Sequence, residues 1–232
     1  MAHKVWHHHG QMSEAFRTVM FLSASGGLQD AYTYIGRGKV FANAQTGNIV
    51  LMSQAAFNGD LSRVLHYLIP LLSFALGVAA AEVIHIRYRE AKRLHWRPLV
   101  LVVEILLLFG VGFIPNTLDL AANALVSFAC AMQVQAFRKV HGYPFASTMC
   151  IGNMRSGMES LVVYFHLHDK KVLHKALHYF GVILLFAFGA GVGAHCVGVF
   201  GNKTIWFSCA LLLVSLCFMF IQDEEEALKE KA

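Results

Sequence analysis

The chain has 232 residues, of which 56% are apolar and only 14% are charged, and its mean hydropathy is +0.53. Because soluble domains carry a charge on about a quarter of their residues, this composition excludes an ordinary water-soluble domain. The net charge of +5 does not indicate nucleic-acid binding, since the basic residues lie between apolar runs rather than on one exposed face with aromatic residues.

Six apolar runs follow one another along the chain, with charged segments between them. A helix needs roughly 20 such residues to cross a hydrocarbon core about 30 Å thick. We therefore predict an all-α polytopic transmembrane helical bundle in the inner (plasma) membrane of a bacterial cell. The six predicted spans are residues 18–35, 65–86, 99–114, 120–140, 172–197 and 204–221.

Two further apolar runs, residues 48–57 and 153–165, are too short to cross the bilayer and suit re-entrant or half-spanning helices. With the spans they divide the chain into four consecutive parts. These are a cytoplasmic N-terminal segment 1–15, a first membrane repeat 16–114, a second membrane repeat 118–221 and a cytoplasmic tail 222–232 with acidic and basic residues.

An internal duplication underlies the two membrane repeats. At an ungapped offset of 105 residues, Asp30-Ala31 and Gly47-Asn48 align with Gln135-Ala136 and Gly152-Asn153. Further along, Leu-His-Tyr at 65–67 recurs at 177–179, and both copies are followed by a small-xxx-small pattern typical of close helix packing. Because each half holds three spans, an odd number, the second half is expected to lie upside down, as an inverted repeat.

The distribution of basic residues discriminates between six spans and eight. With six spans, fourteen Lys and Arg residues lie on one side and four on the other, and both termini are on the rich side. With eight spans the division is ten against eight, and the N-terminus lies outside. Since positive residues are retained on the cytoplasmic side, six spans with both termini cytoplasmic are favoured.

Polar residues gather where each short run begins, next to Gly47 and Gly152. A polar loop at membrane depth must be satisfied by protein or by water, and inverted repeats bring the starts of the two short helices together near the midplane. Helix capping is the alternative role for the same residues. The candidate solute- or ion-binding residues are Asp30, Asn43, Gln45, Thr46, Asn48, Gln133, Thr148, Asn153, Arg155 and Glu159.

Four ionisable residues lie within apolar runs, where an isolated charge costs at least about 2.5 kcal/mol on insertion scales. They are Asp30, Glu104, Arg155 and Glu159. In one interpretation, Arg155 pairs with Glu159 along its own helix or with Asp30, purely for structure. In the other, Asp30 is a proton- or cation-coupled carboxylate and Arg155 its gate or anion contact.

No sequence feature indicates enzymatic chemistry, a cofactor or a metal. The chain has no GxSxG, HExxH, P-loop or dinucleotide-binding motif, and its five cysteines are scattered without a CxxC pair. We therefore expect neither an enzyme nor a disulfide framework nor a zinc site.

Two motifs carry a resemblance to a known family. Gly-Gly-x-x-Asp-Ala at residues 26–31 precedes Val-Phe-x-Asn-x-x-Thr-Gly-Asn at 40–48, and Met-Gln at 132–133 precedes Gly-Asn at 152–153. Over almost its whole length the chain resembles the YoaK-type family of bacterial membrane proteins. The resemblance implies about six transmembrane segments but no substrate, because the family's function is unknown. Ile151 departs from the family's frequent Thr, so a hydroxyl contact is not expected there.

Three functions follow as hypotheses. The first is a transporter or channel for an unknown small solute or ion, built as two inverted halves around the Gly-Asn loops. The second is a non-transporting membrane scaffold or assembly factor, for which packing glycines and an acidic tail suffice. The third, ranked last, is an intramembrane enzyme acting on a lipid. A homodimer is also expected, and no nucleic-acid partner.

Overall fold

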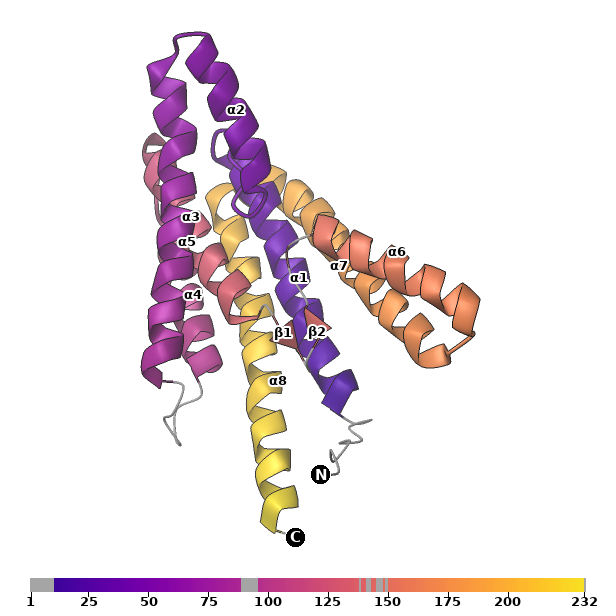
Figure 1. The fold of residues 1–232 in the computed structure, drawn as a ribbon. Helices are drawn as coiled ribbons and strands as arrows, with labels where there is room; N and C mark the ends of the chain where they lie inside the picture. Colours follow the sequence, from indigo (N-terminus) through magenta and orange to yellow (C-terminus); the bar gives the residue numbers. More distant parts are fainter. Residues whose placement is uncertain are drawn as a thin grey trace.

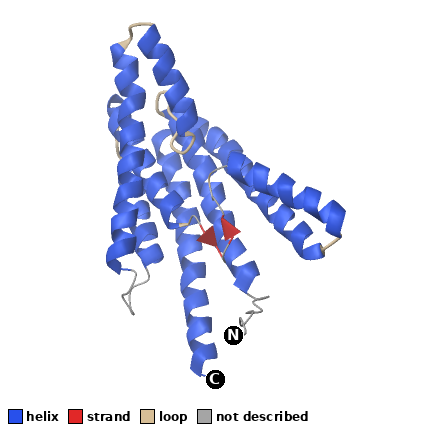
Figure 2. Cartoon of the chain, viewed as in Figure 1, coloured by secondary structure: helices blue, strands red, loops and turns tan. Residues whose placement is uncertain are grey.

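The structure is a computed structural model that describes residues 11–88, 96–137, 139–140, 143–144, 148 and 150–231, with side-chain surroundings for residues 17–88, 96–137, 148 and 150–220. The described chain is almost wholly helical (Figure 2), in agreement with the predicted fold class. Its elements are α1 Gln11–Gly36, α2 Gln45–Phe57, α3 Leu61–Tyr88, α4 Trp96–Val111, η1 Asn116–Leu118, α5 Asp119–Ala136, β1 Lys139–Val140, β2 Tyr143–Pro144, α6 Cys150–Leu167, α7 Lys170–Phe200, η2 Gly201–Thr204 and α8 Ile205–Lys231.

Each of the six predicted spans coincides with a helix, namely α1, α3, α4, α5, α7 or α8. Two boundaries were wrong, because the spans 99–114 and 120–140 were expected to be helical throughout, whereas α4 ends at Val111 and α5 ends at Ala136. Val140 lies instead in a two-residue antiparallel ladder in which Lys139 pairs with Pro144. Two basic residues follow Phe137, and Pro144 has no backbone N–H with which to continue a helix. Helix α5 therefore ends before the predicted span does.

The helices pair across the two halves of the chain rather than within them. The long contacts join α1 to α7 and α3 to α5, while α8 packs on α1 and α4 packs on α5. The short helices α2 and α6 each pack on the helix that follows them, α3 and α7, as two hairpins that project from opposite sides of the bundle (Figure 1). The start of α1 and the end of α8 lie at the same end of the bundle.

Glycines set the closeness of the two long contacts. A methyl group at Gly77 of α3 would collide with the carbonyl oxygen of Phe128 on α5. A methyl group at Gly189 of α7 would collide with the carbonyl oxygen of Ala24 on α1, and Gly27 of α1 meets Phe186 of α7 in the same way. Backbone therefore touches backbone at both crossings, which is the role predicted for the small-xxx-small patterns.

The outer surface of the bundle is unusually apolar. Among the described residues, many large apolar side chains are exposed on the outer faces of the helices, and 18 polar or charged residues are buried beside the apolar core. Three helical stretches among the described residues are long and apolar enough to cross a membrane, Leu61–Tyr88, Asn116–Ala136 and Lys170–Phe220. The third contains α7 and the part of α8 up to Phe220, joined through η2. An apolar outer surface of this kind suits lipid better than water.

Gly189→Ala should lower the unfolding temperature of the detergent-solubilised protein, because the added methyl group has no space against Ala24. Overpacking of this kind costs about 1–3 kcal/mol. Gly191→Ala on the same helix is the matched control, since a methyl group there meets nothing within 4 Å. Thermal unfolding followed by thiol-reactive fluorescence measures both variants, and equal unfolding temperatures would show that the α1–α7 contact is not this close.

Candidate functional site

The segment after α1 folds back along that helix into the middle of the bundle. Gly38 and Lys39 both have positive φ angles, of 85° and 68°, which reverses the chain direction beyond the helix end. The backbone N–H of Asn43 then donates to the Asp30 carboxylate at 2.7 Å. The Asn43 side-chain amide donates to the carbonyl oxygen of Gly26 at 3.2 Å. The loop therefore returns to the level of residues 26–30, halfway along α1.

Asp30 holds this loop by charge as well as by geometry. Its carboxylate accepts backbone hydrogen bonds from Ala42, Asn43 and Ala44, just before α2 begins at Gln45. Consecutive backbone N–H groups at a helix start form a natural anion site. Asp30 is thus the internal anion of the α2 N-terminus, and within the described residues it forms no ion pair with Arg155.

Asn48 closes the same loop. Its Oδ1 accepts from the Phe41 backbone N–H at 3.0 Å, and its Nδ2 donates to the Phe41 carbonyl oxygen at 2.7 Å. The Nδ2 group also donates to Oε1 of Gln45 at 2.9 Å, and Gln45 in turn donates to the carbonyl oxygen of Ala42 at 2.8 Å. Asn48 and Gln45 are therefore loop-fixing residues, closer to the capping role than to that of free ligands.

The second polar loop reaches the same point of α1. Thr148 is buried, and a methyl group added at Gly26 would collide with its Cγ2 atom. Asn43, from the first loop, is hydrogen-bonded to Gly26 as well. We call the set Gly26, Asp30, Asn43 and Thr148 the loop junction. It brings together Asn43 from the first half of the chain and Thr148 from the second.

The loop junction contains buried hydrogen-bonding atoms with nothing bound to them. Oδ1 of Asn43 and Oγ1 of Thr148 have no hydrogen-bond partner among the described residues. A buried polar atom left without a partner costs about 1–3 kcal/mol. Groups of this kind indicate a position where water, an ion or a solute completes the bonding.

The other predicted site residues divide into two groups. Gln133 and Asn153 are buried, and Gln133 donates to the carbonyl oxygen of Leu22 at 3.4 Å. Thr46, Arg155 and Glu159 are exposed on the surfaces of α2 and α6, away from the loop junction. No ion pair joins Arg155 to Glu159 in the described chain, so neither predicted pairing of Arg155 forms.

The loop junction adjoins a second buried polar group that we call the Gln29 cluster: Ser25 and Gln29 of α1, Glu104 of α4, Cys130 of α5 and Ser208 of α8. The amide nitrogen of Gln29 lies 3.0 Å from Ser25 Oγ, 2.9 Å from Ser208 Oγ and 3.3 Å from Glu104 Oε1. The Cys130 thiol donates to Gln29 Oε1 at 2.5 Å and also contacts the Asn43 side chain. One residue of the loop junction thus touches the cluster.

A third group of polar residues connects the C-terminal ends of α1 and α4 with the N-terminal end of α5. Arg37 is completely buried, and it forms an ion pair with Asp119 at 2.8 Å and a hydrogen bond to the Tyr32 hydroxyl at 2.8 Å. Its guanidinium also donates to the carbonyl oxygens of Val111 and Ile114, which end α4. A charge-assisted network of this size joins α1, α4 and α5 firmly.

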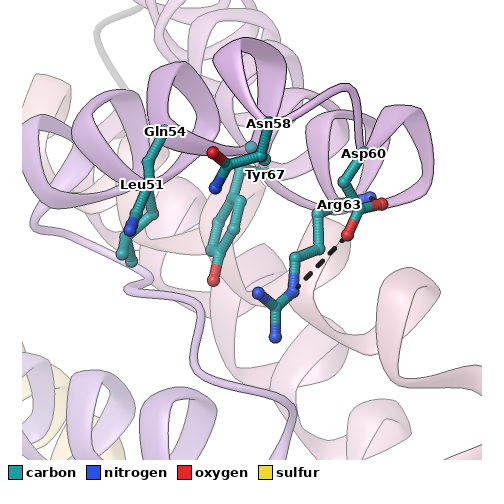
Figure 3. A pocket seen from close by; sticks show the side chains of 7 residues that line it. Leu51, Gln54, Asn58, Asp60, Arg63 and Tyr67 are labelled. Carbon is teal, nitrogen blue, oxygen red and sulfur yellow. Dashed lines mark hydrogen bonds and ion pairs between the residues drawn. The ribbon is translucent and has the colours of Figure 1, made fainter.

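Two cavities lie along the α2–α3 hairpin. One of about 70 Å³ is lined by Leu51, Gln54, Ala55, Asn58, Asp60, Arg63 and Tyr67 (Figure 3). A larger one of about 290 Å³ is lined by Gly38, Lys39, Ser62, Arg63, His66 and Tyr67. Arg63 and Tyr67 line both. Asp60 lies 3.9 Å from Arg63, and both side chains are well exposed, so this pair contributes little stability.

Most of the bundle, including all three polar groups, falls within one family match. A model of the family described as "Protein of unknown function (DUF1275)" matches residues 18–218. The chain belongs to this family. Among curated proteins, this DUF1275 chain is similar to the UPF0700 transmembrane protein YoaK of Bacillus subtilis (strain 168), at 25% identity over 85% of the chain and 92% of the relative. No solved structure matches the chain. The predicted YoaK-type resemblance is confirmed.

Sequence reasoning missed the Gln29 cluster of this DUF1275 protein, apart from noting that Glu104 lies in an apolar run. Serine, cysteine and glutamine are common in helices. Nothing in the linear sequence shows that these side chains, from four different helices, meet in the fold. The available signal was the polar face of α1, where Ser25 and Gln29 are four residues apart and so lie on the same side of the helix.

Asp30→Ala should lower the stability of the DUF1275 protein by about 1.5–3 kcal/mol, the usual contribution of hydrogen bonds to a charged group. Asp30→Asn keeps an acceptor oxygen, so it should recover part of that loss. Glu159→Ala, on the exposed face of α6, is the control and should change little. Thermal unfolding in detergent compares the three. A stable Asp30→Ala protein would show that the loop holds its place without the carboxylate.

Proposed function

We propose that the protein is an inner-membrane transporter or channel for a small solute or ion, with its site at the loop junction. The observation that carries the proposal is that Asn43 and Thr148, one from each half, meet at Gly26, and that a buried oxygen atom of each has no partner among the described residues. A protein that only packs its helices would fill this place with hydrocarbon. Transporters, by contrast, place irregular backbone and polar atoms at the membrane midplane.

The chemistry of the junction favours a cation or a neutral hydrogen-bond donor as the solute. Its unpaired groups are oxygen atoms, which accept hydrogen bonds or coordinate cations. The positive end of α2 is already neutralised by Asp30, so an anionic solute gains little there. The solute site therefore differs from those in which helix N-termini point at an anionic group.

In this proposal α1, α3, α4, α5, α7 and α8 span the membrane, and α2 and α6 are re-entrant, in two inverted repeats. The packing supports it, because exchanging α1 with α5, α2 with α6, α3 with α7 and α4 with α8 converts each major contact into another major contact. The directions support it as well, since α1 and α5 run in opposite senses (Figure 1). The fourteen-to-four distribution of basic residues favours a cytoplasmic location for both termini.

Single cysteines introduced at Asn58 and at His168 test this topology in a background without the native cysteines. Both positions are exposed and lie at the tips of the α2–α3 and α6–α7 hairpins. We expect a membrane-impermeant maleimide added to intact cells to label position 58 only, and position 168 to react only after the membrane is opened. Labelling of both from one side would contradict the inverted arrangement.

Flux into proteoliposomes tests the transport function. The purified protein is screened with radioactive monovalent cations, ammonium analogues and small neutral metabolites, comparing wild type with Thr148→Val. This change keeps the shape of the side chain and removes the unpaired hydroxyl, so saturable flux should fall at least about tenfold, the effect of roughly 1.4 kcal/mol in an equilibrium or a barrier. Thr46→Val, on the exposed face of α2, is the matched control and should retain full flux.

Absence of flux for every solute, with protein shown to be folded by its unfolding temperature, would overturn the transport proposal and favour a membrane scaffold. Equal loss of flux in Thr148→Val and Thr46→Val would also overturn the site, because the second residue does not face the junction.

A further inference from the structure

Glu104 is the most deeply buried acidic residue in the described chain. It is the ninth of 16 residues in α4 and has no exposed surface. At 1.5 Å per residue, it is about 12 Å along the axis from either end of the helix. In the six-span arrangement this places the carboxyl group near the middle of the bilayer.

No positive charge balances this carboxyl group. Among the described residues, none of the ion pairs involves Glu104, and the buried Arg37 is committed to Asp119. The titratable groups that face it are Cys130 of α5 and Cys209 of α8, with Asp30 further along α1, and none of them is a cation. An ionised carboxylate in these surroundings costs several kcal/mol, so a cation must accompany it.

The geometry around Glu104 distinguishes a proton from a metal ion. The oxygen atoms that would surround a metal ion, from Ser25, Ser208 and Glu104, all lie within 3.3 Å of the Gln29 amide nitrogen. That nitrogen occupies the point where a metal ion would have to bind. The second oxygen, Glu104 Oε2, is buried and has no partner in the part of the chain that the structure describes, so it is the open position on the carboxyl group. A proton bound there neutralises the group without displacing Gln29.

We infer that Glu104 is a proton-binding site, held as a neutral carboxylic acid within the Gln29 cluster. Binding adds a proton to Oε2 of the carboxylate, and release returns that proton to water when the cluster opens. The cluster also contacts the loop junction, because Cys130 touches both Gln29 and Asn43. Proton binding at Glu104 is therefore coupled to the solute site, a role that rests on the proposed transport function. Asp30 does not have this proton-binding role, because its carboxylate is bound to loop amides.

Infrared spectroscopy of the purified protein in lipid nanodiscs tests the site without transport. The wild type should show the carbonyl stretch of a protonated carboxylic acid at neutral pH, shifted in D2O, and Glu104→Gln should lose it. Glu159→Gln is the matched control, since Glu159 is exposed on α6, and it should keep the band. If Glu104→Gln does not fold, Glu104→Leu replaces it, because an apolar residue suits a site that holds a neutral group.

A band of equal intensity in wild type and in the Glu104 variant would overturn the inference. So would an unfolding temperature that rises with sodium ions in wild type but not in the variant, since the ligand would then be a metal ion. Proton uptake into pyranine-loaded liposomes, driven by a potassium diffusion potential, tests the coupling and should be lost in Glu104→Gln. If the protein shows solute flux but no carboxylic-acid band, only the proton site is refuted. If it shows the band but no flux, only the proposed transport function is refuted.

Discussion

The hydrogen bond between the Asp30 carboxylate and the Asn43 backbone N–H, at 2.7 Å, is the constraint on which the interior depends. It draws eight residues of irregular chain back to the middle of α1 and fixes where α2 begins. Backbone at this depth has no water to satisfy its polar groups, so each must find a partner in the protein. Asp30 and Asn48 supply those partners for the first loop, and the position of the loop then leaves room for Thr148 beside Gly26.

The loop junction and the Gln29 cluster each contain a buried carboxyl group, but they stabilise it in different ways. At the junction, a charge is stabilised by the amides of a helix start, which is a permanent arrangement. In the cluster, the Glu104 carboxyl group of α4 is surrounded by neutral side chains from three other helices, and one of its oxygens has no partner among the described residues. The first arrangement fixes a loop in place. The second responds to the surroundings, because its bonding is complete only when something else binds.

The sequence predicted the helices well because apolar run length is a local property, and it located both polar loops because glycine and asparagine mark interruptions. It failed where three-dimensional packing decides the partner. Arg37 was counted among loop charges, yet it is buried against Asp119, 82 residues away. Arg155 was expected near Asp30 or Glu159, yet it lies on the exposed face of α6. Charge and spacing along a helix do not reveal which face its neighbours cover.

The cross-pairing of the two halves has a consequence for how the protein is made. Helix α1 is synthesised first and carries the polar residues Ser25, Gln29 and Asp30, yet its main partner, α7, begins roughly 130 residues after α1 ends. At synthesis rates of about 5–20 residues per second, that delay is about 7–27 s. During that time the polar face of α1 has no protein surface to cover it, so the insertion machinery or an early loop contact must shelter it. The bundle can therefore be completed only after its last helices, α7 and α8, have been made and have packed on α1.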